Sequence, residues 1–284
     1  MTRGTAGPAA LAGSCALAVV ALWFAANDLA PGREFDAALA DAAHTGFAGF
    51  NQELLKGASS LGDTLPIAVG SLALAALAWL RGGRRLALVV ALALLAGNVA
   101  TQLTQPALIE ARHVDLTGTA LEGSGSWPSG HAMAAMLLAL LAILVAGPRL
   151  RVVTALVGLA YALGLGTALV ALGGHLPSDV TAAYLVAATF TLAGAAVYAA
   201  LRDDRESDGA CARTRTRTRS PRVAPALGAL AAAAVLATGI GKAVVTRRDE
   251  VARALDQVPL VLAGAAALTV AVLIGAGAVI VLRR

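Results

Sequence analysis

The chain has 284 residues, of which 58% are hydrophobic and 14% are charged, and its mean hydropathy is +0.76. A soluble domain usually carries about a quarter charged residues, so this composition excludes an ordinary water-soluble domain. The formal net charge is +5, but no basic or aromatic recognition module accompanies it, which argues against nucleic acid as a partner.

Several apolar runs of about 20 residues are long enough to cross the hydrocarbon core as helices. They predict an all-α, polytopic membrane helical bundle. In chain order the runs cover residues 8–28, 62–80, 86–105, 131–147, 152–172, 177–201, 224–244 and 259–282. The first run could be a signal peptide, but its length and the lack of a clear small-residue cleavage site favour a retained helix.

The segment between the first two runs, residues 33–59, carries apolar residues near helical spacing. Two interpretations remain open for it. It could form an amphipathic helix that lies along the membrane surface, or a solvated connector that packs on the bundle.

The composition also divides the chain into three parts. Residues 1–201 are expected to form a six-helix membrane core. Residues 202–223 are polar and rich in arginine, which predicts a flexible cytoplasmic loop. Residues 224–284 are expected to hold two extra C-terminal transmembrane helices, and the sequence assigns them no role. The two cysteines, Cys15 and Cys211, have neither zinc spacing nor a disulfide framework.

The positions of lysine and arginine predict the orientation of the bundle. Most of the 22 lysines and arginines fall in the segments that would share a side with the N-terminus. By the positive-inside rule this side is the cytoplasm, so both termini are expected there, with the protein in the cell membrane. The end of the run at 86–105 and the starts of the runs at 131–147 and 177–201 then lie at the outer face.

Three polar clusters meet at this outer face, and they hold three of the four histidines. They read "TQPALIEARH" at 104–113, "WPSGH" at 127–131 and "GGHLPSD" at 173–179. A helix N-terminus exposes unpaired N–H groups and a positive dipole end, so it is a ready anion site. Gly130 allows close backbone approach and Ser129 adds a hydroxyl donor. Arg112 offers a fork of donors that matches phosphate oxygens.

The third cluster adds a nucleophile. His175 and Asp179 are four residues apart, so on a helical turn the carboxylate can reach one imidazole nitrogen and leave the other a better nucleophile. His131 is a second imidazole, able to give a proton to a departing oxygen. Each residue taken alone also has a purely structural explanation, such as a solvated helix end or a helix cap. Their coincidence on one face is what predicts phosphate-ester cleavage.

The second and third clusters, "PSGH" at 128–131 and the His-x3-Asp half of "GGHLPSD", resemble signatures of the type 2 phosphatidic acid phosphatase (PAP2) superfamily. The resemblance covers about residues 60–200. It implies a six-helix membrane core with a site at the outer leaflet. It also implies that His175 is the phosphorylated nucleophile, that Asp179 is its partner and that His131 is the general acid. Phosphate would be bound by Arg112, Ser129 and Gly130.

The chain departs from the other family signatures at four positions. Gln105 stands where the family has Lys, and His113 where it has Pro. Ala168 and Leu169 stand where it has Ser and Arg. Gln105 still donates a neutral hydrogen bond, and His113 is a candidate replacement cation. The residues that the resemblance implies are catalytic are thus retained, but two positively charged phosphate ligands of the family are replaced by uncharged residues. This loss is expected to weaken stabilisation of the transition state.

The leading hypothesis is therefore an integral-membrane lipid phosphatase. Its candidate substrates are phosphatidic acid, phosphatidylglycerol phosphate and a polyprenyl pyrophosphate. A second hypothesis is a non-catalytic lipid-phosphate binder or scaffold of the same fold. A lipid transporter ranks last, because ionisable residues near mid-membrane are not evident. No metal or other cofactor is implied, since the outer face has few carboxylates, and the oligomeric state stays open.

The predicted topology can be tested with reporter fusions. Reporters placed at Arg217 and Arg284 should both report the cytoplasm, and a reporter at Ser124 should report the outside, because the arginine bias sets orientation. A cytoplasmic Ser124 would overturn the assignment of the three clusters to an outer face.

Overall fold

The computed structural model describes residues 3–109 and 127–211. Within these ranges every regular element is a helix, which confirms the all-α class. The helices are α1 (Arg3–Asn27), α2 (Ala30–Gly46), α3 (Gln52–Ser60), α4 (Thr64–Ile109), α5 (Gly130–Val145), α6 (Arg151–Ala171) and α7 (Pro177–Cys211).

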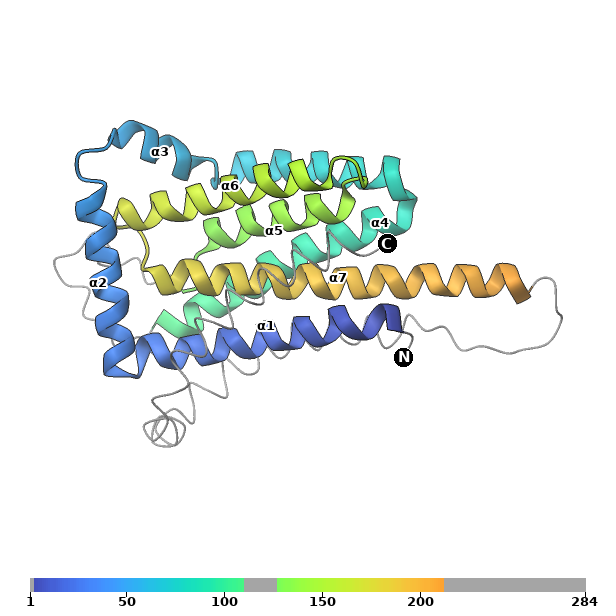
Figure 1. Ribbon diagram of the computed structural model, residues 1–284, viewed down its shortest axis with the longest axis horizontal. Coiled ribbons are helices and arrows are strands. Elements are labelled where there is room, and N and C mark those ends of the chain that lie inside the picture. The colour runs from blue at the N-terminus through green and yellow to red at the C-terminus, as the bar shows by residue number, and fades with distance from the viewer. Residues whose placement is uncertain (1–2, 110–126, 212–284) are drawn as a thin grey trace.

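Helix α4 consists of two arms that fold back on each other (Figure 1). Its 46 residues would extend about 69 Å if straight, roughly twice the thickness of a bilayer core. The break lies at Gly83, whose φ of 67° and ψ of −166° are not helical. Arginines 81, 84 and 85 surround it, and these charges favour a turn outside the hydrocarbon. The two arms correspond to the runs predicted at 62–80 and 86–105.

The length and surface of the helices suit a membrane. Helices α1, α4, α6 and α7 are each long and apolar enough to cross one. Large apolar side chains project outward from α4 and α6, where a soluble protein would carry polar groups. Examples are Leu65, Leu72, Leu80, Leu156 and Val157. The described chain is therefore that of a membrane-associated helical protein.

Two of the predicted features differ from the structure or lie beyond it. Helix α7 continues to Cys211 and so enters the segment 202–223 that was predicted as a loop. Extending an existing helix by a few turns needs no new nucleation, which allows polar residues to continue it. The runs at 224–244 and 259–282 lie outside the described residues, so the six-plus-two helix arrangement stays a prediction.

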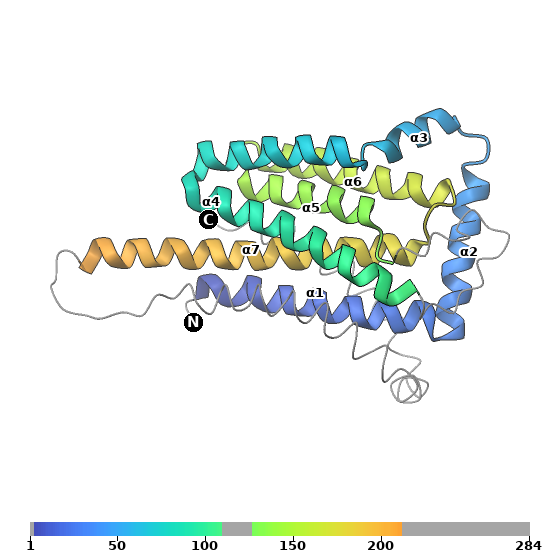
Figure 2. The ribbon, with the colours of Figure 1, turned by 180° about the vertical axis from the view of Figure 1, so that it is seen from behind.

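The short helix α5 lies inside the bundle. It packs against α4, α6 and α7, and α7 packs in addition against α1 (Figures 1 and 2). Most residues of α5 are buried, and Met133, Leu137 and Leu141 are among the largest fully buried side chains. Small residues such as Gly158, which faces Ala139, allow the helices to approach closely.

Helices α2 and α3 occupy the segment 33–59 that was left with two interpretations. α2 crosses one end of the bundle (Figures 1 and 2) and contacts α1, α6 and α7, while α3 packs on α6. The segment is thus helical and packed on the bundle, with Phe35 and Leu54 exposed on its outer side. It combines features of both interpretations.

The bend of α4 depends on a backbone conformation that only glycine adopts readily. We expect Gly83→Ala to lower the free energy of unfolding by about 1–3 kcal/mol, because no neighbour lies within 4 Å and backbone strain alone acts. Thermal unfolding in detergent measures this. Gly164→Ala is the matched control: Gly164 is helical with nothing within 4 Å, so its change should be neutral or stabilising. Equal stability of both variants would contradict a required turn at Gly83.

Candidate functional site

The first half of the site is the start of α5. Ser129 is the N-cap residue, with φ −62° and ψ 120°, and its Oγ accepts a hydrogen bond from the Ala132 amide at 3.4 Å. Serine is favoured at this position because its oxygen satisfies an amide that has no acceptor within the helix. Ser129 is fully buried. The cap places Gly130 and His131 in the first turn, at the positive end of the helix dipole.

The second half of the site is the turn from α6 into α7. Gly173 has a φ of 72°, a left-handed conformation that lets the chain reverse after α6. Pro177 then begins α7 and Asp179 lies in its first turn. Proline at the first position and an acid in the first turn both favour a helix start. His175 precedes this start by two residues.

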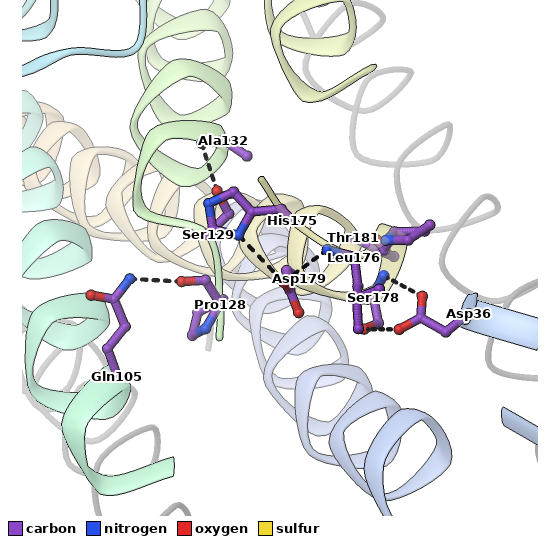
Figure 3. A network of polar contacts seen from close by, with 11 residues as sticks. Asp36, Gln105, Pro128, Ser129, Ala132, His175, Leu176, Ser178, Asp179 and Thr181 are labelled. Atoms are coloured by element: carbon purple, nitrogen blue, oxygen red, sulfur yellow. Dashed lines mark hydrogen bonds and ion pairs between the residues drawn. The ribbon is translucent and has the colours of Figure 1, made fainter. Parts of the chain in front are cut away.

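His175 and Asp179 are in contact, as their spacing predicts. The distance from His175 Nδ1 to Asp179 Oδ2 is 3.3 Å, and the Leu176 amide donates to the same oxygen at 3.0 Å (Figure 3). Both side chains are buried, with 8% of His175 and 1% of Asp179 exposed. The carboxylate therefore holds the imidazole and closes its own helical turn.

A backbone hydrogen bond joins the two halves. The Ser129 amide donates to the Asp179 carbonyl at 3.1 Å. The starts of α5 and α7 are thereby fixed to each other, and Figure 3 shows Ser129 beside His175 and Asp179. The polar clusters at 127–131 and 173–179 are thus in direct contact.

The second arm of α4 brings Gln105 from the first cluster to the same place. Its Nε2 donates to the Pro128 carbonyl at 2.9 Å (Figure 3) and would lie 3.6 Å from a Cβ on Gly130. Leu169 behaves differently. Its carbonyl accepts from the Gly174 amide at 2.9 Å, but its side chain is buried in the main apolar cluster. Leu169 is thus a packing residue at a position where the resemblance implied a charged ligand.

His131 has a partner that sequence reasoning missed. Its Nε2 lies 3.2 Å from Oδ1 of Asp63, and 45% and 59% of the two side chains are exposed. Asp63 lies directly before α4. The available signal was an acid at the start of the apolar run at 62–80, which the predicted topology places at the outer face. Gly62 packs so closely that a Cβ on it would come within 2.9 Å of His131 Cβ.

A second missed residue is Asp36 on α2. Its Oδ1 accepts from the Ser178 amide at 2.8 Å and its Oδ2 accepts from Ser178 Oγ at 2.6 Å (Figure 3). Asp36 is only 6% exposed. No sequence signal indicated it, because its partner lies 142 residues away.

Other residues from the sequence analysis are placed elsewhere. Arg112 and His113 lie outside the described residues. His44, the one histidine of the sequence outside the three polar clusters, lies on α2, with its Nδ1 3.1 Å from the Ala171 carbonyl oxygen. Among residues 3–109 and 127–211, no group of three or more His, Cys, Asp and Glu side chains is arranged to hold a metal ion.

The arrangement has the parts that anion chemistry needs. A buried imidazole is held by a carboxylate and lies beside a helix start whose dipole favours negative charge. A second imidazole, more exposed, is held by a separate carboxylate. The model of the PAP2 superfamily matches residues 82–203, a range that holds both helix starts and Gln105. No curated protein and no solved structure matches the chain.

Proposed function

We propose that the chain, whose residues 82–203 match the model of the PAP2 superfamily, is a member of that superfamily and an integral-membrane lipid phosphatase. It cleaves a phosphomonoester or pyrophosphate of a lipid at the outer leaflet. The family alone supports a membrane protein of the phosphatase type. The observation that carries the finer proposal is the buried His175–Asp179 pair, fixed to the start of α5 by the Ser129 amide.

His175 acts as the nucleophile in this proposal. Asp179 accepts a hydrogen bond from Nδ1–H, which keeps the proton on that nitrogen and leaves the lone pair of Nε2 free to attack phosphorus. The Nε2–P bond forms as the bond from phosphorus to the leaving oxygen breaks. The carboxylate stabilises the imidazole as it becomes positively charged.

His131 acts as the general acid and then as the base. It gives its proton to the leaving oxygen, which departs as the lipid alcohol or lipid phosphate. Water then attacks phosphorus, His131 takes the water proton, and the P–N bond breaks. Inorganic phosphate leaves and His175 is restored. Asp63, at 3.2 Å from His131 Nε2, orients the ring.

Phosphate is bound at the start of α5. Gly130 and the first-turn amides approach it from the backbone, and Ser129 and Gln105 line the same turn. Arg112 and His113, which lie outside the described residues, are proposed as the positively charged ligands of the phosphate. The candidate substrates are phosphatidic acid, phosphatidylglycerol phosphate and a polyprenyl pyrophosphate.

One observation favours a second candidate function. The side chain of Leu169 is packed in the apolar core and Gln105 is neutral, so two cationic ligands of the family pattern are missing. A lipid-phosphate binder without turnover would tolerate this loss. Phosphate release by the purified protein separates the two functions.

The roles of the two histidines can be tested separately. We expect His175→Ala to lower phosphate release by roughly 10³-fold or more and to abolish covalent labelling by a phosphorylated substrate. His131→Ala should lower turnover by about 10²–10⁴-fold, but less with a good leaving group, which needs little acid assistance. His44→Ala is the control and should keep its activity. Equal turnover in wild type and His175→Ala would rule out this mechanism.

The missing positively charged phosphate ligands lead to a gain-of-function test. Gln105→Lys places a charged donor at the start of α5 and should raise kcat/KM, or tighten vanadate binding, by roughly 10- to 100-fold. Leu169→Arg is unsuitable, since it would bury an unpaired guanidinium in the apolar cluster. Gln102→Lys, three residues earlier on α4 and exposed, is the matched control. No gain in a folded Gln105→Lys protein would mean that another residue already supplies the cation.

A further inference from the structure

Asp36 is a buried charge in an otherwise accessible helix. It is the one buried residue of α2, and only 6% of it is exposed. Acidic side chains are almost never buried unless they are paired. Its neighbour Asp41 on the same helix is exposed. The burial of Asp36 therefore needs an explanation from its contacts.

Those contacts lie at the start of α7. Ser178 donates to Asp36 twice, from its amide at 2.8 Å and from its hydroxyl at 2.6 Å (Figure 3). Amides in the first turn of a helix have no acceptor within the helix, and a negative charge at that end is stabilised by the dipole. Asp36 thus caps α7 from a different helix, through hydrogen bonds strengthened by its charge.

Ser178 lies within the turn that carries the proposed catalytic pair. The Leu176 amide on one side of it donates to the Asp179 carboxylate, which also contacts His175. The Asp179 carbonyl on the other side accepts from the Ser129 amide. A shift of Ser178 would therefore move the nucleophile and its partner relative to the start of α5.

We propose that Asp36 is a positioning residue for phosphoryl transfer, which acts through Ser178 to hold His175 in line with phosphate bound at α5. This inference rests on the proposed function. Among the described residues, Asp36 is hydrogen-bonded to Ser178, which lies next to Asp179 in the chain. It lies upstream of the family match at residues 82–203, so α2 supplies a part of the site from outside the matched region.

The test compares Asp36→Ala, Asp36→Asn and Ser178→Ala with the control Asp41→Ala, using phosphate release from phosphatidic acid, phosphatidylglycerol phosphate and a polyprenyl pyrophosphate. Misplacement of a reacting group by about 1 Å can cost roughly 100-fold in rate. We expect Asp36→Ala to lower kcat by roughly 10- to 100-fold with little change in KM. Asp36→Asn keeps one acceptor oxygen and should recover part of the loss. Asp41→Ala should match wild type.

A double variant tests whether Asp36 acts through Ser178. Ser178→Ala removes the hydroxyl but keeps the amide donor, so its loss should be smaller than that of Asp36→Ala. The double variant should lose no more than Asp36→Ala alone, because both changes break the same contact. Additive losses in kcat would overturn the proposal.

Further outcomes separate this inference from the proposed function and from a purely structural role. An active wild type with unchanged kcat in both Asp36→Asn and Ser178→Ala overturns the inference alone, even where Asp36→Ala does not fold. A loss that appears only as lower thermal stability, with normal kcat in the folded protein, also overturns it. A wild type that releases no phosphate from any of the three lipids overturns the proposed function, and the inference with it.

Discussion

The hydrogen bond from the Ser129 amide to the Asp179 carbonyl, 3.1 Å long, is the contact on which the rest of the site depends. It ties together two helix starts that are far apart in the chain. A helix start offers amides without partners and a positive dipole end. Joining two of them concentrates both effects at one point. Because α5 is enclosed by α4, α6 and α7, its start cannot move without repacking the core.

The polar groups around this contact are buried, so their hydrogen bonds must be nearly complete to be tolerated. The Asp179 carboxylate contacts the His175 imidazole and accepts a hydrogen bond from the Leu176 amide. Ser129 caps α5. Inside a low-dielectric bundle such hydrogen bonds are stronger than in water, and a buried polar group without a hydrogen-bond partner would destabilise the fold. The network therefore restrains the turn, as the proposed role of His175 as a nucleophile would require.

Segments upstream of the family match complete the network. Asp36 on α2 binds Ser178, and Asp63 before α4 lies against His131. Each carboxylate supports a different half of the site, one buried and one exposed. The segment between α1 and α4 thus does more than connect them, since α2 supplies Asp36 and the linker after α3 supplies Asp63.

The sequence by itself determined the helical class, the placement of the apolar runs and the contact of His175 with Asp179. These follow from local rules: apolar length, helical spacing and the preference of serine and proline for helix starts. Only the tertiary structure decided that Asp36 meets Ser178, that Asp63 meets His131 and that the side chain of Leu169 packs in the apolar core. These outcomes depend on which faces of distant helices pack together, and no local pattern of residues specifies that packing.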